Sequence, residues 1–383
     1  MKKVMLFLSA CALSAACLGG VTAAAEQAPA LARGCKAAYL CDWQSGTPVF
    51  EVNAREHLPV ASMCKIMTLV LCFEELDKGL SLGETIAVSE HAAGMGGSQV
   101  FLEAGGEYPA GALIESICIA SANDSSVAMA ERIAGSEQQF VARMNERARQ
   151  LGMKDTCFVN CTGLPAAGQY CCAHDAAVML SELLRHAEYF AYSKIWTDTM
   201  HHPGDRVTEM ANTNKLIRTY RGCDAGKTGY TSEAGFCLAA SAVRGDMRAV
   251  AVVIGAPDSK TRFDGAAGMF DHVFANYTHK TVLGEGVAEG ALCPVKGGKK
   301  REICVRPSRR VSVFCAKEDA GGVELRFSLP QAKAPVAEGE QVGSVAVYKD
   351  GVEYDVVPLL ANEPSPKSTY FDALQDIARG WGF

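Results

Sequence analysis

The sequence predicts an α/β (α+β) protein: a large domain with a central antiparallel sheet flanked by helices, then a small all-β domain and a terminal amphipathic helix. Two apolar runs, Phe236–Val243 and Met247–Ile254, flank a short polar turn and indicate a buried hairpin. The stretch from Ser62 to about Leu76 is apolar on nearly every face, which predicts a buried central helix. Near Leu283 the composition changes to short alternating runs, and 383 residues suffice for two domains.

The other elements of the large domain follow from periodicity and turn residues. The segment from Ala37 to Glu51 has short apolar runs on either side of Gln44-Ser45-Gly46, which predicts a hairpin. Helices are expected over 114–134, with a polar break at 121–124, over 140–151, where the apolar residues share one side, and over 263–277.

The small domain is expected to consist of strands. Short alternating runs occur at 303–305, 311–314, 323–327, 345–348 and 354–357. Asp350-Gly351 predicts a hairpin turn between the last two runs, and Pro364-Ser365-Pro366 interrupts the pattern. We therefore expect a first domain over 26–282, a C-terminal β-sandwich domain over 283–363 and a tail over 364–383.

The tail has apolar residues at helical spacing from Ser368 to Phe383, and Thr369 with Asp372 predicts a capping box at its start. Terminal Trp381 and Phe383 are typical of a helix in a membrane interface, so the tail is a candidate for peripheral membrane contact. Packing onto the β domain is the alternative, because the polar face has few Lys and Arg residues.

The N-terminus predicts export. Lys2-Lys3 is followed by an apolar run from Val4 to Leu18, and Ala23-Ala24-Ala25 then resembles a signal-peptidase site. We expect a signal peptide over 1–25, since the run is too short to span a bilayer comfortably. A lipoprotein signal at Cys17 is the weaker alternative, because the expected leucine lies one position too early.

Composition excludes several classes of function. The formal net charge is −6, and no dense basic stripe indicates nucleic-acid binding. No Cys or His cluster has zinc spacing, so neither a metal nor a cofactor is expected.

The chain has 16 cysteines, two of them in the expected signal peptide. The others are scattered singly among apolar residues, which favours free thiols that act as small buried hydrophobes. In one strand, Cys35 and Cys41 would lie roughly 20 Å apart, too far for a disulfide. Adjacent Cys171 and Cys172 have poor disulfide geometry.

The first chemical pattern is Ser62-Met63-Cys64-Lys65. On a helix, Ser62 and Lys65 share a face, and Ser62 lies at the expected helix start, where free N–H groups favour developing negative charge. Serine needs a base to become a strong nucleophile, and a buried lysine with a lowered pKa can serve as that base. Cys64 is the nearest rival nucleophile, but at i+2 it faces away from Ser62.

Two further patterns are weak alone. Ser121 of Ser121-Ala122-Asn123 offers a hydroxyl that relays a proton, and Asn123 offers an amide that can hold a peptide. In Lys227-Thr228-Gly229, Lys227 and Thr228 could bind a carboxylate, while Gly229 lets a substrate backbone approach. A second positive charge at Lys227 would further lower the pKa of Lys65.

Together, S-x-x-K, S-x-N and K-T-G in this order resemble the D-alanyl-D-alanine carboxypeptidases, the low-molecular-mass penicillin-binding proteins of the β-lactamase/transpeptidase superfamily. The resemblance covers roughly Ala37 to Phe383. It includes the segments 59–68, 121–124, 140–156, the Asn-x-x-Gly-Leu loop at 160–164, 225–231 and, in the β domain, 334–336 and 339–343. One departure is the stretch 169–172, where a His-Tyr-Ser-Thr-like sequence is more familiar.

The resemblance implies a β-lactamase/transpeptidase-like fold and a serine peptidase at the cell wall or the outer face of the cytoplasmic membrane. Its substrate would be a peptidoglycan pentapeptide ending in D-Ala-D-Ala, and β-lactam antibiotics would be covalent inhibitors. The implied catalytic residues are Ser62, Lys65 and Ser121. Substrate binding is implied for Asn123, Lys227, Thr228 and Gly229, and the backbone N–H groups of Ser62 and Tyr230 would form the oxyanion hole.

Three alternatives remain open. A β-lactamase would need a deacylation base, and Glu182-Leu183-Leu184-Arg185 does not fit the expected Glu-x-x-Leu-Asn pattern. A non-catalytic wall-binding protein could share the fold. A disulfide-rich surface protein would need paired cysteines.

Overall fold

The computed structural model describes residues 31–318 and 322–372. The expected signal peptide, 1–25, and most of the expected tail helix, 373–383, lie outside the described residues. The first described turn of that helix shows the expected capping box: Thr369 N donates to Asp372 Oδ2 at 2.8 Å, and Asp372 N donates to Thr369 Oγ1 at 3.3 Å.

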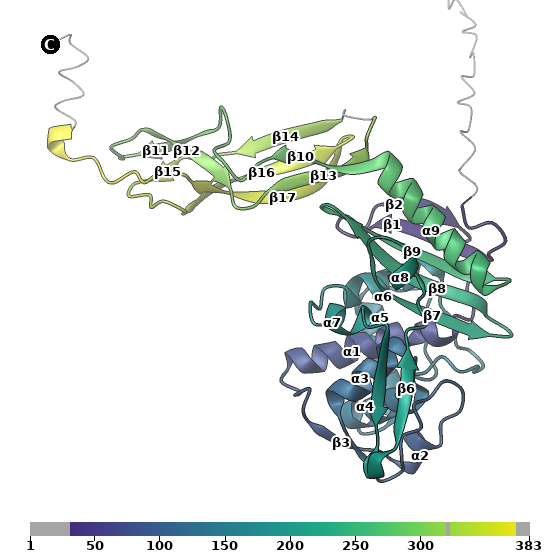
Figure 1. Ribbon diagram of the computed structural model, residues 1–383. Coiled ribbons are helices and arrows are strands. Elements are labelled where there is room, and N and C mark those ends of the chain that lie inside the picture. Colours follow the sequence, from purple (N-terminus) through teal and green to yellow (C-terminus); the bar gives the residue numbers. More distant parts are fainter. Residues whose placement is uncertain (1–30, 319–321, 373–383) are drawn as a thin grey trace, which may run out of the picture. The chain divides into compact units, whose positions relative to one another are not determined.

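A five-stranded sheet in the order β2-β1-β9-β8-β7 forms the centre of the first domain (Figure 1). Every neighbouring pair is antiparallel. The predicted hairpins are confirmed as β1–β2 and β8–β9. The strands are β1 (Ala37–Asp42), β2 (Pro48–Val52), β7 (Cys223–Thr231), β8 (Gly235–Arg244) and β9 (Met247–Ala256). Strand β7 lies at one edge, which leaves one side of Lys227-Thr228-Gly229 unpaired by the sheet.

Helices cover both faces of this sheet, and side chains that alternate along each strand supply both cores. Tyr39 and Val252 pack with the larger helical group, whereas Leu40 and Val253 pack under α9. The larger group comprises α1 (Lys65–Asp77) with its leading 3-10 turn η1 (Ala61–Cys64), α3 (Ala110–Ile119), α4 (Asn123–Ala134), α5 (Glu137–Gln150) and α6 (Ala173–Leu183). The opposite face carries α8 (Leu216–Thr219) and α9 (Ser259–Asn276).

The helices predicted in the first domain are all present. The break expected at 121–124 separates α3 from α4. Helix α9 begins before the expected residue 263, because Asp258 caps it by accepting from Thr261 N at 2.7 Å. In α5, Phe140, Met144 and Ala148 are buried on one side, as the amphipathic pattern predicts.

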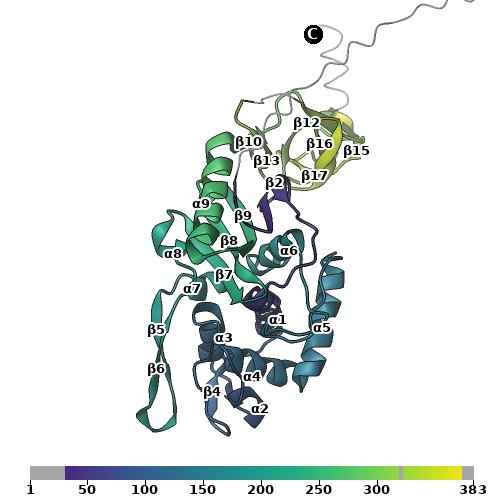
Figure 2. The same cartoon turned by 90° about the vertical axis from the view of Figure 1, so that its right-hand side faces the viewer.

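Two small hairpins flank the helical group (Figure 2). One pairs β3 (Thr85–Ala87) with β4 (Glu107–Pro109), and the other pairs β5 (Thr197–His201) with β6 (Val207–Ala211). The short helices α2 (Glu90–Ala93), α7 (Tyr189–Ser193) and η2 (Pro203–Asp205) complete this region. The segment 94–106, which we call the 94–106 loop, joins α2 to β4.

The C-terminal part is the β domain that the sequence predicts. A six-stranded sheet has the order β14-β16-β17-β12-β11-β15, and β10 pairs with β13. Val313, Val345 and Val357 belong to one apolar core that strands of both sheets share. The strands are β10 (Tyr277–Leu283), β11 (Leu292–Lys296), β12 (Glu302–Pro307), β13 (Val311–Ala316), β14 (Val323–Ser328), β15 (Ala332–Lys333), β16 (Gln341–Lys349) and β17 (Val352–Ala361).

Asp350 and Gly351 form the expected turn, both with positive φ. Strands β10, β11 and β15 were not predicted. Strand β10 precedes the domain boundary expected at residue 283, and Ser365, in the expected tail, forms an isolated bridge with Val336.

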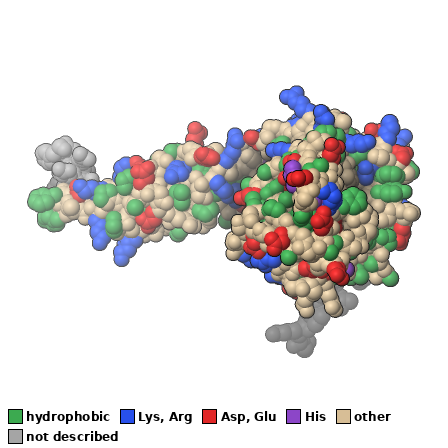
Figure 3. Space-filling model, turned by 60° about the horizontal axis from the view of Figure 1, so that its bottom comes forward, with side chains coloured by type: hydrophobic (Ala, Val, Ile, Leu, Met, Phe, Trp, Pro, Cys, Tyr) green, Lys and Arg blue, Asp and Glu red, His purple; other side chains and the backbone are tan. Residues whose placement is uncertain are grey.

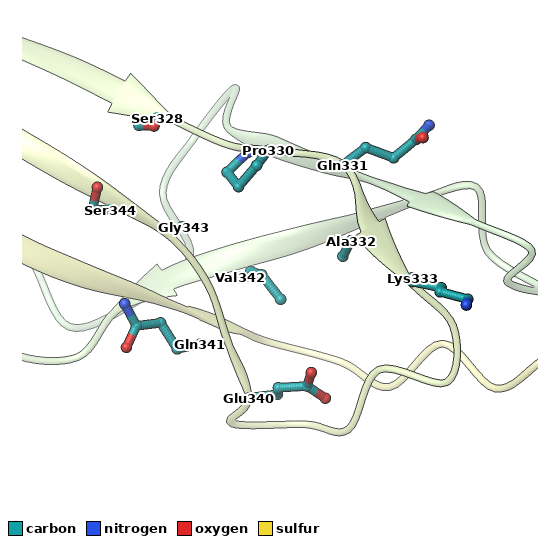
Figure 4. Close-up of a pocket in the computed structure, with 10 residues that line it drawn as sticks. All are labelled: Ser328, Pro330, Gln331, Ala332, Lys333, Glu340, Gln341, Val342, Gly343 and Ser344. Carbon is teal, nitrogen blue, oxygen red and sulfur yellow. The ribbon is translucent and has the colours of Figure 1, made fainter.

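A cavity of about 680 Å³ opens in this β domain, and Figure 4 shows the side chains that line it. They come from residues 328–344, so the cavity contains none of the site residues predicted from the sequence. Among the described residues, no helix is both long and apolar enough to cross a bilayer.

Candidate active site

Ser62 lies in the 3-10 turn that leads into α1, as the sequence predicts. The preceding residue, Ala61, has φ of 48°, a left-handed conformation that non-glycine residues rarely adopt. Such strain persists only where the surroundings impose it, and it is common at active sites. The Ser62 side chain is partly exposed, whereas the next two residues, Met63 and Cys64, are buried.

Lys65 is fully buried, and its Nζ lies 3.0 Å from Ser62 Oγ and 2.6 Å from the Thr162 carbonyl oxygen. The predicted i, i+3 contact between Ser62 and Lys65 is therefore present. Burial lowers the pKa of Lys65 from 10.5 to about 8, because desolvation disfavours the ammonium form. A lowered pKa increases the neutral fraction of this amine, which is the form that could accept the Ser62 proton.

Ser121 and Lys227 form the second pair. Ser121 lies in the break between α3 and α4 with φ of 63°, and Lys227 Nζ lies 2.7 Å from its Oγ. Both side chains are buried. The two residues are 106 positions apart, and only the docking of β7 beside the helical group brings them together.

The two lysines interact with each other across the site. The pKa of Lys227 falls well below 10.5, first through burial and then through the positive charge of Lys65. For Lys65, burial is the largest cause. Repulsion between two charges is reciprocal, so it disfavours the state in which both amines are protonated.

Asn123 is the first residue of α4, and only one of the two polar atoms of its side-chain amide has a hydrogen-bond partner. Its Nδ2 donates to the Gly96 carbonyl oxygen at 2.6 Å, whereas its Oδ1 is buried without a partner. Buried polar atoms rarely lack a partner, so this oxygen is a ready acceptor for a substrate N–H. Asp124, next in the chain, accepts from Val100 N and Leu102 N and so ties the 94–106 loop to α4.

The third predicted group lies on the edge strand β7. Thr228 Oγ1 donates to Thr213 Oγ1 at 2.7 Å. Gly229 differs from the expectation that it makes room for substrate. A Cβ there would lie 2.4 Å from the Val60 carbonyl oxygen, so its missing side chain is needed for β7 to pack against η1. Tyr230 is 57% exposed and lies over Phe236.

The close packing of β7 on η1 bears on the predicted oxyanion hole. A Cβ on Gly229 would also lie 3.2 Å from Met63 N, so the two segments meet backbone to backbone. Ser62 and Tyr230 flank that contact. Their N–H groups remain the predicted donors to an oxyanion.

The loop over 160–164 positions Lys65, although the sequence assigns no individual role to its residues. Asn160 Oδ1 accepts from Gly163 N at 2.7 Å and Thr162 N at 3.2 Å, which holds the Thr162 carbonyl toward Lys65. A Cβ at Gly163 would lie 2.0 Å from the Ala61 carbonyl oxygen. The Asn-x-x-Gly-Leu pattern marked this loop, but only the fold shows that it supports the base.

The rival nucleophile is excluded. Cys64 is buried, its Sγ donates to the Asn160 carbonyl oxygen at 3.3 Å, and burial raises its pKa to about 12. A thiol reacts as its thiolate, which this environment disfavours. All cysteines from Cys35 to Cys315 are free in the structure, as predicted.

One group in the described part of the chain combines side chains that ligate metals: Cys172, His174 and Asp175. Their polar contacts already account for these side chains, and His174 Nδ1 lies 2.9 Å from Asp175 Oδ1. Cys172 Sγ caps α6 by accepting from Asp175 N, and Asp175 accepts from Asp155 N and Thr156 Oγ1. Burial also raises the pKa of Cys172 to about 12, which disfavours the thiolate that a metal requires.

Comparisons with known proteins agree with this geometry. Residues 22–258 match the family model of D-alanyl-D-alanine carboxypeptidases, and residues 277–367 match that of the penicillin-binding protein 5 C-terminal domain. D-alanyl-D-alanine carboxypeptidase DacF of Bacillus subtilis is 39% identical over 355 residues, which cover 92% of this chain and 91% of the relative. DacC of Escherichia coli is 30% identical over 350 residues, 88% of this chain and 86% of DacC.

Solved structures show the same fold. Penicillin-binding protein 5 from Haemophilus influenzae is similar with a TM-score of 0.71 and 26% identity, covering 87% of this chain and 98% of that one. Its similarity spans both the sheet-and-helix domain and the β domain. With a family model over most of the first domain and relatives matched along nearly their whole length, this chain belongs to the D-alanyl-D-alanine carboxypeptidase family.

Proposed function

We propose that this family member is a serine carboxypeptidase that removes the terminal D-Ala from peptidoglycan stem peptides through an acyl-enzyme on Ser62. The single observation that carries the assignment is the 3.0 Å contact between Ser62 Oγ and the buried amine of Lys65. The second pair, Ser121 and Lys227, lies within the same site and supplies a route for the second proton.

Acylation begins when neutral Lys65 Nζ takes the proton of Ser62 Oγ. The oxygen attacks the carbonyl carbon of the penultimate D-Ala, and the N–H groups of Ser62 and Tyr230 stabilise the oxyanion. As the C–N bond breaks, Ser121 passes a proton to the departing amine and regains one from the lysine pair. D-Ala leaves, and Ser62 keeps the peptide as an ester.

Deacylation repeats the proton transfers in reverse. Water loses a proton to Lys65 and attacks the ester carbonyl, and Ser62 Oγ leaves with a proton, which restores the free enzyme and releases the shortened peptide. Penicillin presents a strained amide to the same serine, so it forms the analogous ester on Ser62.

Substrate binding is assigned to the second and third groups. Lys227 and Thr228 bind the terminal carboxylate, whose negative charge restores the ammonium form of Lys227. Asn123 Oδ1, buried without a partner, accepts a peptide N–H. Gly229 contributes by letting β7 approach η1, which brings these groups to the nucleophile.

We place the enzyme outside the cytoplasm, because its leader has the order of a signal peptide and its substrate class is a wall component. The tail supplies peripheral membrane contact. Its described first turn supports this, since Tyr370 and Phe371 are each 76% exposed.

The β-lactamase alternative is weaker. Glu182, the acid considered for deacylation, pairs with Arg147 at 2.7 Å and with Arg185 at 3.1 Å. Both carboxylate oxygens of Glu182 are therefore occupied by guanidinium groups. The non-catalytic alternative does not account for a nucleophile, a lowered-pKa base and a relay hydroxyl in hydrogen-bond contact.

Mass spectrometry after incubation with penicillin tests the proposal, alongside D-Ala release from a pentapeptide. We expect one covalent adduct and D-Ala release in the wild type and in the Cys64→Ala control, and neither in Ser62→Ala. An adduct that survives in Ser62→Ala but disappears in Cys64→Ala would overturn the assignment. Penicillin turnover faster than D-Ala release would instead favour the β-lactamase.

A further inference from the structure

The tip of the β5–β6 hairpin is fastened to the helical part of the domain through His202. This residue is 7% exposed and follows β5 directly. Its Nδ1 lies 2.9 Å from the hydroxyl of buried Tyr108 on β4, and the two rings meet edge to face at 5.7 Å. Its Nε2 lies 2.9 Å from Thr208 Oγ1, on the opposite strand of the hairpin. In Figure 2 the hairpin runs beside α3 toward β4.

The hydrogen bonds favour one protonation state of this histidine. Tyr108 Oη already accepts from Glu103 N at 3.1 Å, so its own proton is free to be donated to His202 Nδ1. The ring is then neutral with its proton on Nε2, which donates to Thr208. A protonated ring would carry hydrogen on both nitrogens and leave the buried Tyr108 O–H without an acceptor.

A second contact ties the hairpin tip to the 94–106 loop. Arg206 Nη2 donates to the Phe101 carbonyl oxygen at 2.7 Å and to Glu103 Oε1 at 2.9 Å. Together with the Tyr108 contact, these hydrogen bonds hold one end of the 94–106 loop against the hairpin. The two segments are far apart in the sequence.

The other end of the same loop forms part of the candidate site. The Gly96 carbonyl oxygen accepts from Asn123 Nδ2 at 2.6 Å, and the Ser98 carbonyl oxygen accepts from Asn123 N at 2.7 Å. These contacts orient the amide so that Oδ1 is left without a protein partner. The position of the 94–106 loop therefore determines where the proposed substrate acceptor points.

We propose that His202 is a positioning residue for substrate binding: its neutral imidazole fastens the hairpin to the 94–106 loop, and the loop holds the Asn123 amide in place for the stem peptide. The inference rests on the role proposed above for Asn123. Loss of the imidazole loosens the loop and weakens peptide binding, whereas Ser62 and Lys65, which lie on η1 and α1, keep their chemistry.

The charges around His202 oppose its protonation. Burial lowers its pKa below 6.5, and nearby Arg206 and His201 act in the same direction, whereas Glu103 and Asp124 act in the opposite one. The hydrogen bonds of neutral His202 therefore persist at neutral pH and are lost only in acid. Peptide affinity that depends on it falls as pH drops through the lowered pKa of His202.

The test measures binding of diacetyl-L-lysyl-D-alanyl-D-alanine by calorimetry in the Ser62→Ala background, from about pH 5 to about pH 8. His202→Phe keeps the ring but removes both hydrogen bonds, and we expect Kd to rise roughly tenfold at neutral pH. His202→Asn keeps an acceptor near the Nδ1 position but cannot be protonated. It should bind nearly as the parent does at neutral pH and lose the additional weakening in acid.

Exposed His201→Asn is the matched control and should behave as the parent. With Ser62 intact, His202→Phe should change kcat less than about twofold, which separates positioning from general unfolding. The inference is overturned if His202→Phe binds the peptide as the parent does, or if His202→Asn weakens in acid as much as the parent.

Asn123→Ala separates the two proposals. If it leaves Kd unchanged, the role of Asn123 is wrong, and the route from His202 to the substrate is wrong with it. If Asn123→Ala weakens binding while His202→Phe does not, only the positioning role of His202 is refuted.

Discussion

At the scale of single residues, the site depends on two buried lysines that lack a carboxylate partner. Lysine is almost never fully buried unless it is paired, because its charge loses hydration. Here Lys65 contacts a hydroxyl and a carbonyl oxygen, and Lys227 contacts the Ser121 hydroxyl and the Thr228 carbonyl oxygen. Burial disfavours the charged form of each amine, so we expect Lys65 to supply the base that serine chemistry needs.

The lowered pKa of Lys65 predicts the acid limb of the pH profile. Only the neutral amine accepts the Ser62 proton, so kcat/KM for D-Ala release should rise with pH and level off above a pKa of about 8. Lys65→Ala should lower acylation by about 10²- to 10⁴-fold, the usual contribution of a general base. Rates measured from about pH 6 to about pH 10, with exposed Lys78→Ala as control, check both points. A profile already flat below about pH 6.5 would contradict the assignment.

At the scale of elements, backbone contacts hold the nucleophile turn in place. The turn η1 is flanked by the 160–164 loop through Gly163 and by β7 through Gly229. On both sides a carbonyl oxygen of the Val60–Ala61 segment occupies the space where a Cβ would lie. This packing accounts for the strained φ of Ala61, because the neighbouring elements leave the turn no room to relax.

Two glycines of nearly the same conformation test this packing. Gly163 and Gly168 have φ of 81° and 84°, but only Gly163 faces backbone atoms. Gly168→Ala should lower the free energy of unfolding by about 1–2 kcal/mol through φ strain alone. Gly163→Ala should cost about 1–3 kcal/mol more through overpacking, and it should also slow acylation by displacing Ala61 and Ser62.

Urea unfolding and penicillin acylation rates, measured on both variants, check these expectations. Equal stability losses in the two variants, or wild-type acylation in Gly163→Ala, would show that the loop does not position the nucleophile.

What could be predicted from the sequence is what depends on neighbours along the chain. The i, i+3 contact of Ser62 and Lys65 follows from helical spacing, and the β8–β9 hairpin follows from two apolar runs around a turn. The strands β11 and β15 are short and mixed in polarity, so their pairing depends on the sheet that receives them. No local pattern indicates that Tyr108 will meet His202 or that Thr162 will accept from Lys65, because tertiary packing creates both contacts.

At the scale of the whole molecule, every site residue lies in the first domain. The two ends of the chain bear on where the protein is located. Figure 3 views the side of the hairpin tip and shows basic and acidic side chains interspersed over that face. A mixed surface of this kind gives that face no strong field to attract a polyanion or a membrane. Apolar side chains are the other route to membrane contact, and the described start of the tail exposes two of them together.

Tyr370 and Phe371 predict that the tail binds a lipid surface. Two adjacent rings, each 76% exposed, gain free energy when an interface covers them, and the tail sequence continues with Trp381 and Phe383. An ion pair between Lys299 and Asp372 at 3.2 Å anchors the first turn to the β domain and favours the alternative of packing there.

In sedimentation with phosphatidylglycerol vesicles, the chain without its signal peptide should bind, and the Tyr370→Ser/Phe371→Ser variant should bind markedly less. Val352→Ser, which alters a 70% exposed apolar residue elsewhere in the β domain, should bind as the parent does. All three should release D-Ala from soluble peptides at the same rate, because the change lies outside the catalytic domain. Equal sedimentation of the double variant and the parent would refute the membrane role and leave packing on the β domain as the function of these two rings.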